Sequence, residues 1–231
     1  MISIKSAREI ETMRRSGKIT AKVLGDLMRA AEPGMTTRKL DDLAEKGIRS
    51  MGGVPTFKGY HGYPCSICTS TNDEVVHGIP GDYVLREGDL LSIDIGTTLD
   101  GYVSDSAVTV AIGEVSEPAK RLMQVTQECL MIGIGQMYRG KHLGDIGYAV
   151  QQHAESHGYG VVRELVGHGI GTKMHEEPQV PNYGRSGSGI ELRSGLVLAI
   201  EPMITEGHYA VETLKDGWTV VTADGKLAAH F

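Results

Sequence analysis

Hydrophobic residues recur at three- and four-residue steps over two early segments of the chain, which is the pattern of amphipathic helices. Ser6 and Glu9 have the spacing of a capping box, so the first helix should begin near Ala7 and end at Pro33-Gly34. A second helix should run from about Thr37 to Gly52-Gly53, with an apolar stripe of Leu40, Leu43, Ala44, Ile48 and Met51. The chain is therefore expected to open with a pair of helices.

The pattern then changes to β-strand and repeats. A strand-rich region covers about 65–112, and two further helices are expected over about 117–138 and 143–157. Strands return in "GVVRELVGHG" and "SGLVLAIEPMI". A helix pair followed by strands, twice over, predicts an α+β fold whose two similar halves share one sheet. No low-complexity linker divides the halves, so residues 1–231 are expected to form a single domain.

Two aspartates lie inside the most apolar pair of predicted strands, Leu90–Ile95 and Val103–Val110. Carboxylates are rarely buried unless they are paired or bind metal. The Asp-Gly between the strands predicts a hairpin. A four-residue loop over 98–101 would place Asp94 directly opposite Asp105, with Cβ atoms about 4.5–5.5 Å apart. A two-residue loop would set them two positions apart, and turn-capping roles for both aspartates stay open.

Three further polar residues lie where predicted strands end. His168 stands between two glycines in "ELVGHGIG", which would let the backbone come close to a metal or a substrate. Glu201 ends the apolar run "LVLAIE", and His77 lies at a strand-to-turn junction. A lone histidine at a strand end is commonly structural. Taken with Asp94 and Asp105, however, His168 and Glu201 make an oxygen-rich set that suits Mn, Fe, Co or Zn in a hydrolytic two-metal site.

Composition narrows the class of protein. The net charge is −6, with a net of +4 over residues 1–50 and −10 over the remainder, so an acidic bulk argues against a nucleic-acid substrate. No run approaches the length of a membrane span and the N-terminus lacks a signal peptide, so a cytoplasmic protein is expected. Cys65 and Cys68 form a C-x-x-C, but its β-branched and Ser-rich setting favours half-buried strand cysteines over a zinc or redox motif.

A series of motifs resembles the type I methionine aminopeptidases, a family with the pita-bread fold. The motifs are "YHGYP" at 60–64, "NDEVVHGIP" at 72–80, "IDIG" at 93–96, "SDSA" at 104–107, "GHGIG" at 167–171, "HEEPQVPNYG" at 175–184 and "IEPM" at 200–203. The resemblance covers nearly the whole chain. It implies two pseudo-symmetric halves around a curved, mainly antiparallel sheet, and removal of the N-terminal methionine from nascent proteins.

The resemblance also implies roles for single residues. Asp94 would bind one divalent ion, Asp105 would bridge two, and His168 and Glu201 would hold the other; cobalt, manganese, iron and zinc are all candidates. Glu201 would also move a proton, His175 would stabilise the developing oxyanion or the scissile amide, and His77 would contact the peptide on its leaving side. The methionine pocket would be lined by Phe57, Tyr60, Tyr63, Cys68 and Trp218.

The sequence departs from the family pattern at two places. Met174 stands where an aromatic residue is common in the family, which predicts a softer pocket wall. In the family, a glutamate that bridges both metals and begins the last sheet strand follows the position of Phe231, where this sequence ends. On this basis we expect the 231-residue chain to lack one ligand and one strand, to hold metal weakly or singly, and to have very low activity.

Two alternatives stay open at this point. A proline-specific relative, such as prolidase or aminopeptidase P, shares the fold and the ligand pattern but usually carries an extra N-terminal domain. A non-catalytic pita-bread protein would bind peptides or proteins, although such proteins tend to lose metal ligands. The resemblance implies a monomer that acts on chains with an N-terminal methionine. The basic N-terminal region, with Arg14, Arg15, Lys18 and Lys22, could touch the ribosome transiently.

Overall fold

The computed structural model describes residues 2–231 and contains the four expected helices. They are α1 (Ala7–Ala30), α2 (Thr37–Ser50), α3 (Glu117–Gly135) and α4 (Leu143–Ser156). The predicted capping box is present, because the Ser6 side chain accepts from the Glu9 N–H while the Glu9 carboxylate accepts from the Ser6 N–H. Helix α3 ends at Gly135, earlier than predicted, after a last turn weakened by two glycines, Gly133 and Gly135.

The strands are mostly short, and every pairing between them is antiparallel. The strands are β1 (Val54–Pro55), β2 (Ile67–Thr71), β3 (Glu74–Val76), β4 (Leu90–Leu99), β5 (Tyr102–Ala111), β6 (Gly160–Val161), β7 (Gly167–Gly169), β8 (Glu176–Val180), β9 (Leu198–Ala199), β10 (Met203–Thr205), β11 (Val211–Thr213), β12 (Val220–Thr222) and β13 (Ala228–His230). A single 3₁₀ turn, Tyr60–Gly62, precedes β2.

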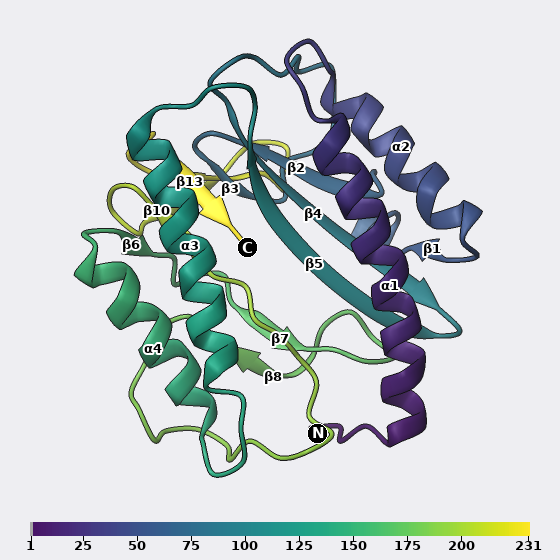
Figure 1. The fold of residues 1–231 in the computed structure, drawn as a ribbon, viewed down its shortest axis with the longest axis vertical. Coiled ribbons are helices and arrows are strands. Elements are labelled where there is room, and N and C mark those ends of the chain that lie inside the picture. The colour runs from purple at the N-terminus through teal and green to yellow at the C-terminus, as the bar shows by residue number, and fades with distance from the viewer. Residues whose placement is uncertain (1) are drawn as a thin grey trace.

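Hydrogen bonding divides these strands into four groups rather than one continuous ladder. The largest joins β1, β4, β2 and β5, and the others are β13-β10-β6, β11-β12-β3 and β8-β7-β9. Figure 1 shows α1 and α2 on one side of the molecule, α3 and α4 on the other, and the long strands β4 and β5 between them. The two helix pairs therefore flank the central strands β4 and β5.

The β4–β5 hairpin has a different register from the four-residue-loop alternative. Its loop is the two-residue turn Asp100-Gly101, and both residues have positive φ, 50° and 78°. A positive φ at both positions matches the twist of the flanking strands, and Asp-Gly is a favoured sequence for such a turn. As a result Asp94 faces Ala107, and Asp105 faces Gly96. The expectation that Asp94 and Asp105 face each other directly is wrong, and the two-position offset is what occurs.

Each helix pair packs its apolar stripe on a separate core cluster. Residues of α1 and α2 meet the β4 strand through Leu24, Leu27, Leu40, Ile48, Leu91, Ile93 and Ile95. Residues of α3 and α4 meet β10 and β13 through Leu122, Val125, Val150, Ile204 and Ala229. Since fully burying an aliphatic side chain contributes about 1.5–3 kcal/mol, these two clusters hold the helices in place.

None of the helices described over residues 2–231 is long and apolar enough to cross a membrane. All three cysteines are free: Cys68 is buried on β2, Cys129 is buried on α3, and Cys65 is partly buried just before β2. No helix begins at the C-x-x-C. The prediction of half-buried strand cysteines is correct only in part, because Cys68 lies in a strand but is buried, and Cys65 is half-buried but lies before the strand.

Candidate metal centre

Asp94 and Asp105 point to the same side of the β4–β5 hairpin although they are not directly paired. Asp105 lies two positions from Ala107, the partner of Asp94, and residues two apart on a strand share a face. Diagonal neighbours of this kind are close enough for long side chains to interact. Both carboxylates line a cavity of about 210 Å³ together with Glu201, and Leu130 and Ile134 of α3 form part of its wall.

His168 is held in one orientation by its own strand. It lies on β7, and its Nδ1 is 2.9 Å from the carbonyl oxygen of Gly169, which acts as the acceptor. This contact places the proton on Nδ1 and leaves Nε2 to face the carboxylates, 3.5 Å from Asp105 Oδ2 and 3.1 Å from Glu201 Oε1. A metal-binding imidazole commonly donates its other N–H to a carbonyl in this manner.

The glycines on either side of His168 serve the strands and not a metal. A Cβ at Gly167 would lie 2.3 Å from the carbonyl oxygen of Ala199, and one at Gly169 would lie 2.4 Å from that of Glu177. They allow β7 to pack between β8 and β9. The expectation that these glycines bring the backbone close to a metal or substrate is therefore wrong, since what approaches is neighbouring backbone.

Glu201 lies between two short strands. β9 ends at Ala199 and β10 begins at Met203, so the side chain leaves an irregular segment and not the end of one long strand. Asn182 Nδ2 donates to the Glu201 carbonyl oxygen over 2.7 Å and fixes the backbone there. The carboxylate side chain, 22 % exposed, turns toward His168 and the cavity beside Asp105.

The titratable side chains of this group shift one another's pKa values. Loss of water contact, together with the neighbouring carboxylates of Asp105 and Glu201, raises the pKa of Asp94 well above its ordinary value. Burial by itself would raise the pKa of Glu201 and lower that of His168, but the attraction between them dominates. The imidazoles of His168 and His230 lower the pKa of Glu201 to about 2, and the carboxylates of Asp105 and Glu201 raise the pKa of His168 to about 10.

Two fully buried oxygen atoms in the group have no hydrogen bond within residues 2–231. They are Asp105 Oδ1 and Glu201 Oε1. Glu201 Oε1 is close to His168 Nε2, but the contact is an ion pair without hydrogen-bond alignment. One donor atom from each of Asp105, His168 and Glu201 lies within 4.8 Å of the others. Buried carboxylate oxygens without partners, beside an imidazole nitrogen, are the donor set that a divalent transition ion requires.

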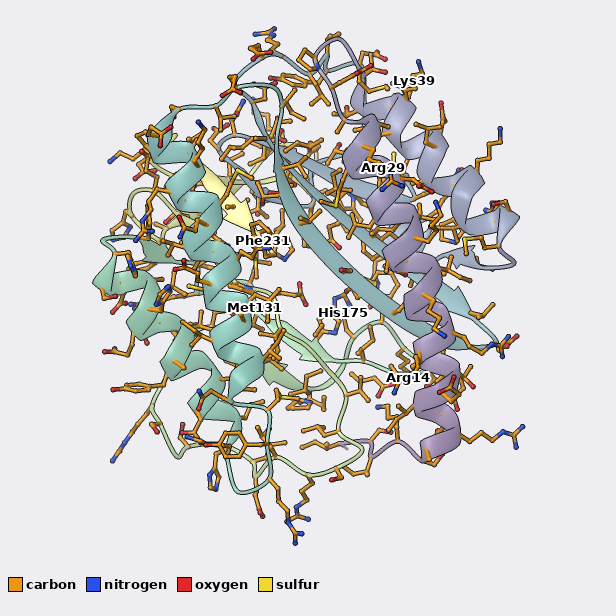
Figure 2. All side chains as sticks on the ribbon, in the orientation of Figure 1. Arg14, Arg29, Lys39, Met131, His175 and Phe231 are labelled. Atoms are coloured by element: carbon orange, nitrogen blue, oxygen red, sulfur yellow. The ribbon has the colours of Figure 1, made fainter. Side chains whose placement is uncertain are left out.

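His175 and His77 lie close to this group. The His175 ring centroid is 4.3 Å from that of His168, and Tyr60 Oη is 2.7 Å from His175 Nδ1. Figure 2 shows His175 between the two helix pairs. Partial burial and the charge of His168 lower the pKa of His175, while burial and the nearby His230 lower the pKa of His77. Both imidazoles are thus held neutral, and His77 follows β3 with a positive φ of 61°.

His230 is a neighbour of this group that sequence reasoning missed. Its side chain is 1 % exposed, and Nε2 lies 3.7 Å from Glu201 Oε2. Neither ring nitrogen has a hydrogen-bond partner within the described chain. The backbone is fixed by Thr109 of β5, whose hydroxyl accepts from the His230 N–H at 2.8 Å and donates to its carbonyl at 2.9 Å. A histidine in the apolar run "LAAHF" was the available signal.

Four of the five predicted pocket residues come together in one apolar cluster. Phe57, Tyr63 and Cys68 are buried and pack with Trp218, whose ring meets that of Tyr63 edge-on at 5.0 Å. Met174 contacts the same cluster, at the position expected to soften the wall. The fifth residue, Tyr60, instead forms a hydrogen bond to His175 through its hydroxyl. Cys68 faces Asp94 across the β2–β4 ladder, which brings the cluster up to the carboxylates.

The geometry agrees with comparisons to known proteins. The chain matches metallopeptidase family M24 over residues 11–224. The methionine aminopeptidase of Clostridium acetobutylicum is 54 % identical over 232 residues, which cover 100 % of this chain and 93 % of that protein. The crystal structure of methionine aminopeptidase from Rickettsia prowazekii has a TM-score of 0.98 at 44 % identity, covering 100 % of this chain and 94 % of that structure.

More distant structures share the fold alone. The prolidase from Pyrococcus furiosus has a TM-score of 0.77 at 22 % identity and covers 98 % of this chain and 64 % of that structure. The expected pita-bread fold is confirmed by the methionine aminopeptidase structure, which matches over the whole chain at twice that identity. Because the family match, the 54 % identical relative and the converging carboxylates and imidazole all agree, the chain belongs to metallopeptidase family M24.

Proposed function

We propose that this protein removes the N-terminal methionine from newly made polypeptides by metal-assisted hydrolysis. The observation that carries the proposal is the convergence of Asp105, His168 and Glu201, whose donor atoms lie within 4.8 Å of one another. The name of the 54 % identical relative, methionine aminopeptidase, supports the choice of reaction and substrate. The site also has an apolar cluster beside it, as a methionine side chain would need.

Asp94, Asp105, His168 and Glu201 would hold the metal. We propose two divalent ions, drawn from cobalt, manganese, iron and zinc, because carboxylate oxygens with one imidazole suit these ions better than a thiolate-built site would. Bound ions of this kind make water a nucleophile near neutral pH and polarise a carbonyl oxygen. The ligands come from β4 and β5 in the first half of the chain and from β7 and the β9–β10 segment in the second. For this reason we infer that residues 1–231 act as one catalytic domain.

The protein groups around the ions have separable roles in the proposed reaction. Glu201, kept ionised by His168 and His230, would accept a proton from the attacking water and pass it to the leaving amine. His175 would donate from Nε2 to the oxygen that gains negative charge, since the Tyr60 hydroxyl, whose pKa is raised by burial, stays protonated and can donate to Nδ1. His77, which is neutral and near Glu201, would contact the peptide that leaves.

The methionine side chain would occupy the cluster of Phe57, Tyr63, Cys68 and Trp218. This cluster adjoins the carboxylates, because Cys68 is paired with Asp94. The Tyr63 hydroxyl shares its one proton between the carbonyl oxygens of Ile67, at 3.0 Å, and Gly78, at 3.1 Å, which satisfies its polar atom and fixes the ring. A flexible thioether packs well against such rings.

We place the enzyme in the cytoplasm, because its proposed substrates are nascent chains, and we propose that it is a monomer.

A ribosome-docking role for α1 finds little support in the structure. Arg14 pairs with Glu11, Arg15 with Asp100, and Lys22 with Asp26, so much of the positive charge on this helix is already neutralised. Exposed pairs of this kind also occur on ordinary solvated helices.

The test is substrate selectivity together with removal of one ligand. After loading with Mn²⁺ or Co²⁺, the chain should release methionine from Met-Ala-Ser and leave Ala-Pro intact. Asp105→Asn should reduce this release at least about a hundredfold relative to the parent chain, because it removes a charged metal ligand. Because both rates are measured on variants of the same chain, the expected ratio does not depend on how active the parent chain is. Cleavage of Ala-Pro in preference to Met-Ala-Ser would favour the proline-specific alternative, and absence of bound metal on elemental analysis would favour a non-catalytic protein.

A further inference from the structure

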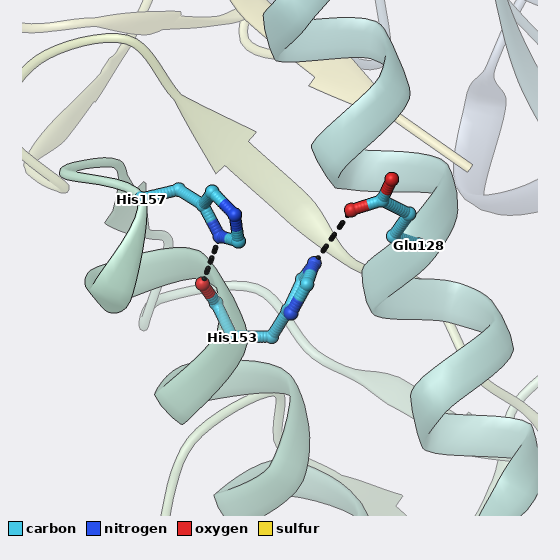
Figure 3. A group of neighbouring side chains, drawn as sticks. All are labelled: Glu128, His153 and His157. Carbon is cyan, nitrogen blue, oxygen red and sulfur yellow. Dashed lines mark hydrogen bonds and ion pairs between the residues drawn. The ribbon is translucent and has the colours of Figure 1, made fainter.

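Two histidines one turn apart on α4 face a glutamate of α3, away from the metal centre described above. They are His153 and, just after the last residue of α4, His157, and the glutamate is Glu128 (Figure 3). His153 Nε2 lies 2.8 Å from Glu128 Oε2, and the two imidazole centroids are 4.5 Å apart. One donor atom from each of the three side chains lies within 4.8 Å of the others.

Hydrogen bonds to the outer atoms orient the group, so that the inward-facing atoms of His153 and Glu128 bond to each other and His157 Nε2 has no hydrogen-bond partner among residues 2–231. His157 Nδ1 is 2.8 Å from the carbonyl oxygen of His153, so the proton is on Nδ1 and the lone pair is on Nε2. Gln124 Nε2 donates to Glu128 Oε1 over 2.8 Å, so the other oxygen, Oε2, is the one that meets His153 Nε2. Outer contacts of this type orient side chains for a metal ion.

A simple ion pair accounts for only part of this arrangement. The contact between His153 and Glu128, with side chains 22 % and 37 % exposed, is an ordinary surface pair of small energetic value. It does not explain why the His157 imidazole also lies with a nitrogen near Glu128 and His153. Two imidazoles and one carboxylate grouped in this way match a single ion of the zinc type.

We propose that Glu128, His153 and His157 form a second divalent-cation site, separate from the catalytic centre and selective for Zn²⁺ or a similar borderline transition ion. The imidazoles exclude Mg²⁺ and Ca²⁺, which take oxygen ligands. Three protein ligands leave a fourth position for water, unlike the closed set of four in a structural zinc site. The ion at this site is therefore exchangeable, and occupancy follows its free concentration.

An ion held here would connect the two helices of the second half. α3 and α4 share a core cluster that includes Leu122, Cys129 and Val150. On α3, two and six residues after Glu128, Leu130 and Ile134 line the cavity that holds Asp105 and Glu201. Since binding to the folded state alone stabilises it by mass action, the bound ion secures the wall of the catalytic cavity.

The experiment compares Zn²⁺ binding by three forms of the full chain after treatment with a chelator. The parent, a His153→Gln/His157→Gln variant and a Glu155→Gln control on the same helix are titrated with Zn²⁺ against a chromophoric chelator. We expect the parent and the control to bind one more Zn²⁺ than the double variant. At free Zn²⁺ about 100 times the dissociation constant, the unfolding midpoint of the parent should rise about 5 °C more than that of the double variant.

Glu128→Gln should keep the stoichiometry of the parent and weaken the extra site at least about tenfold, because a neutral amide replaces the carboxylate. If the double variant folds poorly by circular dichroism, His157→Gln alone replaces it, since that side chain bonds only to its own helix. Equal stoichiometry and affinity in the parent and in the histidine variants would overturn the proposal. Methionine release by the Mn²⁺-loaded double variant should equal that of the parent, which separates this site from the catalytic one.

Discussion

The free nitrogen of each histidine decides what that histidine can do in this protein. His168 donates from Nδ1 to a carbonyl and presents Nε2 to Asp105 and Glu201. In the proposed reaction His175 has the opposite arrangement, in which Nδ1 accepts from the Tyr60 hydroxyl 2.7 Å away and Nε2 carries the proton. His168 would bind a cation through Nε2 once that nitrogen releases its proton, and His175 would donate a hydrogen bond. The second role depends on a single contact.

Removing that contact should slow the reaction without affecting the metal. In Tyr60→Phe the His175 ring loses the partner that fixes its tautomer, and a hydrogen bond of this kind is worth about 0.5–1.5 kcal/mol. We expect kcat for Met-Ala-Ser to fall about tenfold, with KM and the metal content close to those of the parent. Tyr148→Phe, which alters an exposed tyrosine of α4, serves as the control. An unchanged kcat, or loss of metal, would contradict the assigned role of Tyr60.

At the level of helices and strands, the sequence predicts the helices and the hairpin well but leaves the register of β4 against β5 open. The capping box at Ser6 and the Asp-Gly turn are local signals, so they can be recognised without knowledge of the fold. The offset between Asp94 and Asp105 depends on whether the loop has two or four residues, and the pattern allows both. The contact between His230 and Glu201 requires β13 to pair with β10, which is a long-range event that no local pattern encodes.

The turn that sets this register should be sensitive to a side chain at its second position. Gly101 has a φ of 78°, and a Cβ added there would have no atom within 4 Å, so Gly101→Ala tests backbone strain alone. A non-glycine residue in this conformation costs about 1 kcal/mol or more. We expect the unfolding midpoint to fall by roughly 2–4 °C, measured by calorimetry, with metal content unchanged.

Gly135→Ala is the matched control for this change. It also adds a side chain in open space, but in helix α3 and without a positive φ. Because alanine has the higher helix propensity, this variant should be as stable as the parent or slightly more stable. A similar loss of stability in both variants would mean that the Gly101 effect does not arise from its backbone conformation.

For the whole molecule, the candidate metal centre is where the two halves meet. Asp94 and Asp105 come from the hairpin that packs on α1, whereas His168 and Glu201 come from segments beyond α4. The two helix pairs have separate core clusters, so the polar centre provides a further connection between them. Three neighbouring carboxylates repel one another without a cation and attract one strongly. Asp94 should therefore destabilise the metal-free protein and stabilise the loaded one, whereas Glu201 and His168 already attract each other without metal.

Asp94→Asn should show that the effect of the Asp94 carboxylate on stability changes sign when a cation binds. The carboxylates of Asp105 and Glu201, together with loss of water contact, disfavour a charge on Asp94, so replacing it with a neutral amide of the same shape relieves repulsion in the metal-free state. At pH 8 and with a chelator present, we expect the unfolding midpoint of the variant to exceed that of the parent by roughly 2–4 °C, equivalent to about 1 kcal/mol. With saturating Mn²⁺ the order should reverse, because the parent gains more from binding. A variant that is less stable than the parent in both conditions would show that Asp94 serves packing or hydrogen bonding, and that the repulsion among the carboxylates is not what a cation relieves.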